Sequence, residues 1–195
     1  GAVHVSGASG QLRGVWSVLE HNTALLGGAV RALTGASVQL DMCTVRGNRA
    51  TANGGGVAVD GGASLTLAAA STVDVPSSPA SAAPAAAFVG KLAADLGGGV
   101  YVGLGASLTM QSGWRFEGNQ ATFRGGGVSL YGPTAASIDG AVFVNNTAVE
   151  SGGALYIDTK AVAVTVRTTS FKDNCALVGG GAVSVYRSTV VGTGW

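Results

Sequence analysis

The sequence predicts an all-β fold, a parallel β-helix solenoid with three short strands and about 27 residues per coil. A repeat is the first observation: the stretches FEGNQATFRGGGVSL, FVNNTAVESGGALYI and FKDNCALVGGGAVSV begin at Phe116, Phe143 and Phe171. Each holds an aromatic residue, an Asn, an Ala and a glycine cluster in the same order. Alternating apolar residues after each glycine cluster are the second observation, because a period of two indicates a strand with one buried face.

The first expected strand of each coil follows the glycines. Its two apolar positions form columns that run through the whole chain. One column is Val3, Val30, Val57, Val100, Val128, Leu155 and Val183, and the other is Val5, Ala32, Val59, Val102, Leu130, Ile157 and Val185. Strands this short cannot form a closed sheet within one repeat, so we expect each to pair with its equivalents in the coils above and below, about 4.8 Å away.

Two more strands are expected in each coil. The second has the pattern SVQL, SLTL, SLTM and AVTV, beginning at Ser37, Ser64, Ser107 and Ala163. The third precedes the Asn and gives an apolar column of Leu19, Val45, Phe88, Phe116, Phe143 and Phe171. A helical solenoid is excluded, because two or three glycines per repeat would each cost a helix about 1 kcal/mol.

The corner after the third strand carries an Asn column and an Ala column. The Asn side chains are expected to bond to one another along the solenoid, as in other stacked Asn ladders. This column is Asn22, Asn48, Asn119, Asn146 and Asn174, with Lys91 in the remaining position. The Ala column is Ala24, Ala50, Ala93, Ala121, Ala148 and Ala176, where the corner leaves room for a methyl group. The glycines form the next corner, where a Cβ would not fit.

The chain is interpreted as a single β-helix segment, residues 1–195, of about six to seven coils. One coil carries an insertion rich in Ala, Pro and Ser, expected as an extended loop over 68–88, because three prolines exclude it from a sheet interior. No polar capping repeat is recognisable at either end, so we expect other segments of a longer chain to stack there.

Composition excludes several function classes. Charged residues are 11% of the chain and the formal net charge is +1, without the basic stripe that nucleic-acid binding needs. No run of about eighteen apolar residues is present, so no membrane span is expected in this segment. The chain starts at GAVHV without the charged and apolar regions of a secretory leader, so any such signal would lie outside it.

The motifs resemble the repeats of the chlamydial polymorphic outer-membrane-protein family, which pair GGA[ILV] with FxxN. GGAV at Gly27 and Gly180 and GGAL at Gly152 match, as do the FxxN motifs that end at Asn119, Asn146 and Asn174. The resemblance implies a right-handed, pectin-lyase-like β-helix displayed at a cell surface and used for adhesion. Similar repeats occur in surface proteins of algae and other eukaryotes, and the Ala/Pro/Ser insertion resembles an algal hydroxyproline-rich loop. Right-handedness also agrees with the preference of parallel crossovers.

Catalysis on a β-helix requires converging carboxylates, as in polysaccharide lyases and glycoside hydrolases. Acids that share a column here lie three coils apart, roughly 14 Å at strand spacing. The pairs are Asp41 with Asp139, Glu20 with Glu117, and Asp60 with Asp158. His4 and His21 are isolated and lack the spacing of metal ligands. We therefore expect no catalytic, cofactor-binding or metal-binding residue, with polysaccharide cleavage as the enzymatic alternative.

A few residues are candidates for other roles. Tyr101 and Tyr156 share an outward column, where they are either sugar-stacking rings or ordinary strand residues. Asn145 begins the sequence NNT, a candidate N-glycosylation site that would face outward if Asn146 is in the ladder. Cys43 and Cys175 fall in different columns, too far apart for a disulfide, although either could bond outside the segment.

Three functions remain open from these observations. The first is a non-catalytic structural or adhesive cell-surface scaffold. The second is a carbohydrate-binding or polysaccharide-cleaving β-helix, and the third is a scaffold segment of a larger extracellular filament or appendage. The expected location is extracellular or on the cell surface, with surface glycans or another protein as candidate partners and no cofactor.

Overall fold

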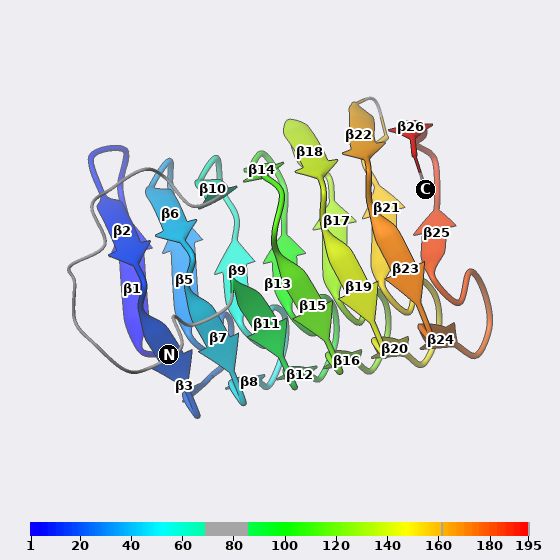
Figure 1. Ribbon diagram of the computed structural model, residues 1–195. Helices are drawn as coiled ribbons and strands as arrows, with labels where there is room; N and C mark the ends of the chain where they lie inside the picture. The colour runs from blue at the N-terminus through cyan, green and yellow to red at the C-terminus, as the bar shows by residue number, and fades with distance from the viewer. Residues whose placement is uncertain (69–85, 161, 195) are drawn as a thin grey trace.

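The structure is a computed structural model that describes residues 1–68, 86–160 and 162–194. Every regular element within these residues is a β-strand. The chain winds into a solenoid with its two termini at opposite ends (Figure 1). The all-β parallel β-helix is thereby confirmed. The expected insertion lies mostly at 69–85, outside the described residues; the strands reach into both of its ends, at Ala68 and at Ala87–Val89.

Four parallel sheets form the described solenoid, and each takes one strand from every coil it crosses. The first sheet contains the strands that follow the glycines: β1 (Val3–Ser6), β5 (Val30–Leu33), β9 (Val57–Val59), β13 (Val100–Val102), β17 (Val128–Tyr131), β21 (Leu155–Asp158) and β25 (Val183–Val185). The second sheet contains β2 (Gln11–Val15), β6 (Ser37–Asp41), β10 (Ser64–Ala68), β14 (Ser107–Met110), β18 (Ala135–Asp139), β22 (Ala163–Arg167) and β26 (Thr189–Thr193).

The other two sheets flank the Asn corner. The third sheet contains β3 (Val18–Glu20), β7 (Thr44–Arg46), β11 (Ala87–Val89), β15 (Arg115–Glu117), β19 (Val142–Val144) and β23 (Ser170–Lys172). The fourth consists of two-residue strands that hold the Ala column: β4 (Thr23–Ala24), β8 (Arg49–Ala50), β12 (Leu92–Ala93), β16 (Gln120–Ala121), β20 (Thr147–Ala148) and β24 (Cys175–Ala176). This fourth sheet adds one short strand to the three expected in each coil.

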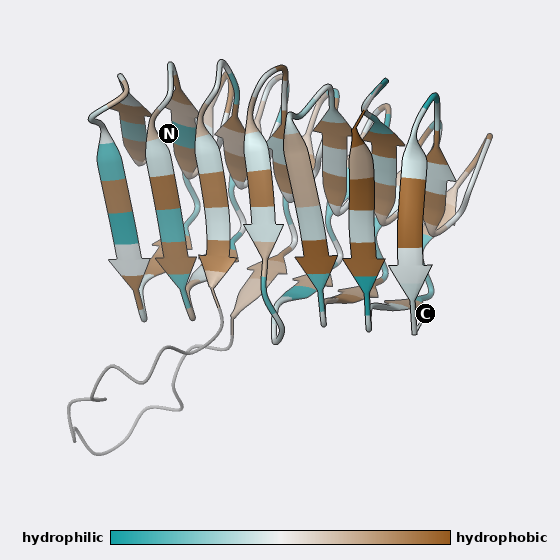
Figure 2. Ribbon diagram, turned by 90° about the horizontal axis from the view of Figure 1, so that it is seen from above, coloured by the Kyte–Doolittle hydropathy of each residue, from teal (hydrophilic) through white to brown (hydrophobic). Residues whose placement is uncertain are grey.

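The register of the sheets follows the columns of the repeat. Val100 pairs with Val57 on one side and Val128 on the other, so equivalent residues of successive coils are direct neighbours. The coil that carries the insertion keeps this register, because Phe88 still pairs with Val45 and Phe116. Bands of apolar residues therefore cross neighbouring strands at the same level (Figure 2). The insertion leaves the stacking of the coils intact.

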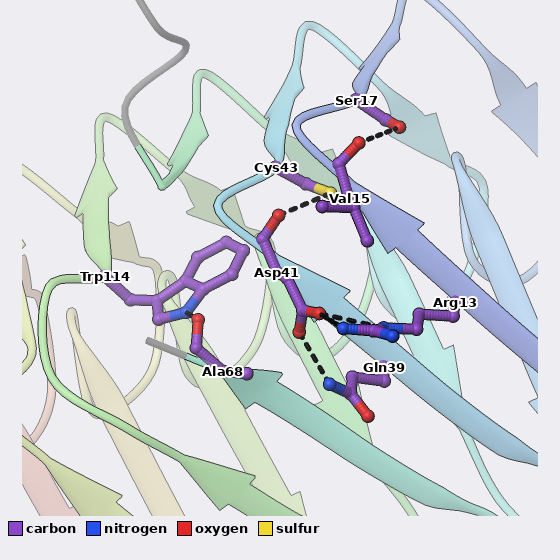
Figure 3. Close-up of polar contacts among 8 residues, drawn as sticks. All are labelled: Arg13, Val15, Ser17, Gln39, Asp41, Cys43, Ala68 and Trp114. Carbon is purple, nitrogen blue, oxygen red and sulfur yellow. Dashed lines mark hydrogen bonds and ion pairs between the residues drawn. The ribbon is translucent and has the colours of Figure 1, made fainter. Parts of the chain in front are cut away.

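The interior is a continuous apolar core that runs along the solenoid axis. The rings of Phe88, Phe116, Phe143 and Phe171 stack in one file, with centroids 4.8, 4.8 and 5.2 Å apart. Trp114 lies against Phe88 at the base of the insertion, and its indole N–H donates to the Ala68 carbonyl at 3.1 Å (Figure 3). This hydrogen bond satisfies the one polar group of a fully buried indole.

The glycine corner has a steric cause. A Cβ on Gly126 would lie 2.3 Å from the Gly153 carbonyl oxygen of the next coil and 2.4 Å from that of Thr147. The preceding residue, Gly125, has a φ of 67°, in the left-handed region that glycine adopts without strain. One glycine therefore allows the backbone to turn, and the next allows two coils to approach closely.

Candidate ligand-binding groove

The Asn corner is a hydrogen-bonded ladder inside the solenoid. The Asn119 side-chain amide donates to Asn146 Oδ1 at 2.8 Å and to the Phe88 carbonyl at 3.0 Å. Asn146 makes the same pair of bonds to Asn174 and Phe116, and Asn22 donates to Asn48. These amides are occupied by one another and by the backbone, so the ladder stabilises the corner and is closed to a ligand.

Lys91 replaces an Asn in this ladder. The side chain is only 1% exposed, and its ammonium donates to the Val89 carbonyl at 2.9 Å. Burial, with a smaller effect from the positive charge of Arg46, lowers the pKa of Lys91 from 10.5 to about 6. The backbone N–H of Lys91 still donates to Asn119 Oδ1 at 3.2 Å, so the substitution breaks the ladder on one side. No ligand-binding role follows from a group this enclosed.

The two tyrosines that are candidates for sugar stacking are covered. Tyr101 and Tyr156 do lie in one column of the first sheet, separated by Ser129, and they are 8% and 3% exposed. The Arg124 guanidinium lies over the Tyr156 ring, 5.1 Å from its centroid. Of the two roles that the outward column allows, this burial favours ordinary strand residues over sugar-stacking rings. Burial also raises the pKa of Tyr101 to about 12.

A groove opens on the outer face of the first sheet beside Tyr156. Its volume is about 440 Å³, and three successive coils line it. The lining residues are Arg124, Tyr131, Glu150, Ser151, Tyr156, Asp158, Ser184, Val185, Tyr186 and Arg187. This size lies within the range of small-ligand pockets in proteins.

Strand register positions the centre of the groove. Tyr131 ends β17 and pairs with Asp158, which ends β21. Tyr186 follows β25 directly, and its backbone N–H donates to the Ile157 carbonyl at 2.8 Å. A tyrosine, an aspartate and a tyrosine therefore occupy equivalent positions on three successive coils. The alternation of the strand points all three away from the core.

Two ion pairs connect the coils across the groove. Arg187 Nη2 donates to Asp158 Oδ2 at 2.8 Å, and Arg124 Nη2 donates to Glu150 Oε1. The Arg187 guanidinium also lies 4.5 Å from the centroid of the Tyr186 ring. The hydrogen bond with Asp158 raises the pKa of Arg187, and that with Glu150 raises the pKa of Arg124, so both guanidinium groups are protonated at neutral pH. The groove is lined by charges that balance one another.

Asp158 has one unpaired oxygen. The residue is 3% exposed, Arg187 occupies Oδ2, and Oδ1 has no hydrogen-bond partner in the part of the chain that the structure describes. A buried acceptor without a donor costs about 1–3 kcal/mol, and more for a charged group. This oxygen is the strongest chemical feature of the groove, since a ligand with a donor could satisfy it.

Asp41 forms a second buried polar cluster near the insertion (Figure 3). One carboxylate oxygen accepts from Arg13 at 2.9 and 3.0 Å, and the other accepts from Gln39 at 2.8 Å. The Cys43 thiol donates to the Asp41 carbonyl at 3.5 Å, and burial raises the pKa of this thiol. Both carboxylate oxygens are satisfied here, so this cluster stabilises the second sheet and offers no free group.

The remaining candidates are spread over the surface and the core. Asn145 is exposed at a corner with a φ of 53°, while Asn146 beside it is buried. Cys175 is exposed, Cys43 is buried, and both are free thiols. Among residues 1–68, 86–160 and 162–194, no cluster of three or more His, Cys, Asp or Glu side chains could hold a metal ion.

Sequence reasoning missed the groove although its residues were visible. Asp60 and Asp158 share a column but lie three coils apart, and this spacing alone indicates no site. The signal that could have found the groove is the same column, because Tyr131, Asp158 and Tyr186 follow one another there on successive coils. The sequence could not reveal the ion pair between Asp158 and Arg187, because the direction of the Arg187 side chain depends on the corner that follows β25.

The in-register coils define the class of protein, a parallel β-helix repeat protein. Residues 140–158 match the family model of the Chlamydia polymorphic membrane protein repeat. This segment contains the FVNN and GGAL motifs and extends to Asp158 of the groove. Over these residues the chain is therefore similar to the polymorphic membrane protein repeat.

Comparison with curated proteins and with solved structures gives no match. Among the described residues, no helix is long and apolar enough to cross a membrane.

Proposed function

We propose that this chain is a rigid, non-catalytic β-helix scaffold of a cell-surface or extracellular protein, which displays adhesive side chains on its outer faces. The observation that carries the proposal is the unbroken register of four sheets in a chain with a polymorphic membrane protein repeat. Proteins of that repeat family are generally non-enzymatic surface scaffolds, and adhesion is the role that the family implies for the displayed residues.

Rigidity follows from how the coils are joined. Neighbouring coils share backbone hydrogen bonds and an apolar core, and most also share a stacked pair of Phe or Asn side chains, so bending between two coils would break all of these together. Outward residues such as Tyr186 and Arg187 lie outside this core, so they can carry recognition without a cost in folding. A stiff rod with independent surface residues is suited to presenting a contact site away from a membrane.

A scaffold of this kind has two sets of surfaces for partners, its ends and its outer faces. Other segments of a longer chain would stack on β1 and β25, which are the end strands of the first sheet. Surface glycans or another protein would meet the outer faces. The third use of such a rod, as a segment of an extracellular filament, would rely on the same end-to-end stacking.

Surface location is tested on cells of the organism that encodes the chain. An antibody raised against residues 1–195 should label intact cells, and a brief protease treatment of those cells should remove the label. A cytosolic protein serves as the control and should be labelled only after permeabilisation. If this chain also requires permeabilisation, the surface proposal is overturned.

The non-catalytic part is tested separately. The purified chain is incubated with polyuronates and with neutral polysaccharides, and new reducing ends and unsaturated products are measured. We expect no release above that of heat-denatured chain. Turnover that scales with the amount of folded chain would favour the polysaccharide-cleaving alternative.

A further inference from the structure

We propose that the groove around Asp158 binds a neutral, hydroxyl-rich ligand, a saccharide unit of a surface glycan. The inference rests on the proposed scaffold function and deepens it, because it names what the displayed surface takes. Neither the repeat nor the column pattern assigns a ligand to these residues.

The unpaired oxygen of Asp158 defines the donor that the ligand must bring. Oδ2 is held by Arg187, while Oδ1 is buried and without a partner. A hydroxyl group donates to a carboxylate oxygen and can accept from a neighbouring guanidinium through its own lone pairs. Adjacent hydroxyls on one ring could therefore bond to Asp158 and Arg187 together.

The side chains that border this oxygen can open a path to it. Tyr186 is 53% exposed and the Arg187 side chain is 48% exposed, so both lie largely in solvent. Exposed side chains change rotamer within nanoseconds. A ligand that shifts the Tyr186 ring and leaves Arg187 on Oδ2 gains a hydrogen bond to the buried, unpaired Oδ1 of Asp158.

The charge of the groove excludes ionic ligands. Arg124 is paired with Glu150 and Arg187 with Asp158, so no guanidinium is free for a sulfate or a phosphate. A metal ion at Asp158 would lie beside the Arg187 guanidinium, which is 2.8 Å from the same carboxylate. Like charges at such a distance repel strongly outside bulk water. Balanced charges with many donors and acceptors instead match a neutral polyol.

The aromatic residues supply the apolar part of the site. Tyr131 and Tyr186 lie on either side of Asp158 along the column, and Tyr186 presents much of its ring to solvent. The C–H face of a sugar packs on such a ring while its hydroxyls point to the polar groups between the rings. A volume of about 440 Å³ has room for a unit of this kind.

The test is an oligosaccharide array probed with the chain of 195 residues, in three arms of neutral, uronate-bearing and sulfated oligosaccharides. Asp158→Asn removes the carboxylate and retains its size, and Tyr186→Ala removes the exposed ring. Asp60→Asn is the matched control, because Asp60 is exposed in the same column but does not line the groove. Thermal unfolding of each variant shows that it folds as the wild type does.

We expect binding to at least one neutral oligosaccharide, weakened at least tenfold by Asp158→Asn and by Tyr186→Ala and unchanged by Asp60→Asn. Binding to no neutral oligosaccharide, binding only to the charged arms, or binding that survives both groove substitutions would overturn the inference. A chain that is surface-exposed on cells but binds no glycan would refute this site and leave the scaffold function standing.

Discussion

Replacing Lys91 by Asn should stabilise the protein by restoring the interrupted ladder. The introduced amide would donate to Asn119 Oδ1 and to the Val45 carbonyl, by analogy with the bonds that Asn119 itself makes one coil further on. Each such hydrogen bond contributes about 1 kcal/mol. The shorter Asn side chain fills less of the core, by about two methylenes. This lost burial offsets the gain by about 0.8 kcal/mol for each methylene.

The larger contribution to the stability gained by Lys91→Asn comes from the removal of the buried amine. The pKa of Lys91 falls to about 6 in the folded chain, against 10.5 ordinarily, so the unfolded chain binds one more proton throughout the range between these values. Stability of the wild type is therefore lost as pH falls from 10.5 to about 6 and is level below that. The slope is about 1.4 kcal/mol per pH unit, or roughly 3 kcal/mol between about pH 6.5 and 8.5.

Urea unfolding, followed by far-UV circular dichroism and by tryptophan fluorescence across this pH range, measures both effects. Lys91→Met is the control, because it keeps the volume of the side chain and removes only the amine. We expect Lys91→Asn to be several kcal/mol more stable than wild type at pH 7, and both variants to lose the slope. A wild-type chain whose stability does not rise with pH, or a Lys91→Asn variant that is less stable than wild type, would refute the reasoning.

Three further predictions concern the core, the corners and the thiols. Phe143→Ala should cost about 3–5 kcal/mol in urea unfolding, since this buried ring stacks between two others, and a loss under 1 kcal/mol would contradict the stacked file. Gly126→Ala, whose Cβ would meet a carbonyl at 2.3 Å, should destabilise the chain more than Gly118→Ala, where φ is 62° and the space is open; the reverse order would contradict the close approach of coils. A maleimide should label Cys175 in the native chain and both cysteines in urea, as counted by mass spectrometry, and native labelling of Cys43 would show that the core is not closed.

The repeat predicted the register because each column is a row of contacts in space. Phe116 and Phe143 are spaced by one period in the chain, and their rings lie one strand spacing apart in the structure. The same columns also show that Lys91 interrupts the Asn ladder. Periodicity carries this information because a parallel β-helix places equivalent residues over one another.

The exposure of outward residues could not be predicted from the repeat. Alternation showed that Tyr101 and Tyr156 leave the core, but not that neighbours and the Arg124 guanidinium cover them. The groove likewise depends on side chains from the corners beside the first sheet. The repeat period does not determine the conformation of these side chains. The short strands of the fourth sheet were missed because two residues are too few to show an alternating pattern.

The register itself is tested most directly by one new disulfide. Thr147 pairs with Cys175 on the next coil, so Thr147→Cys places two exposed thiols on neighbouring strands, within the Cα distance of 4.4–6.8 Å that a disulfide needs. Val149→Cys is the off-register control, since it lies two residues further along the same coil. Under mild oxidation, mass spectrometry should find a bond between Cys175 and the thiol introduced at 147, and none for the control. A chain that stays reduced at 147 while the control is oxidised would contradict the stacked coils.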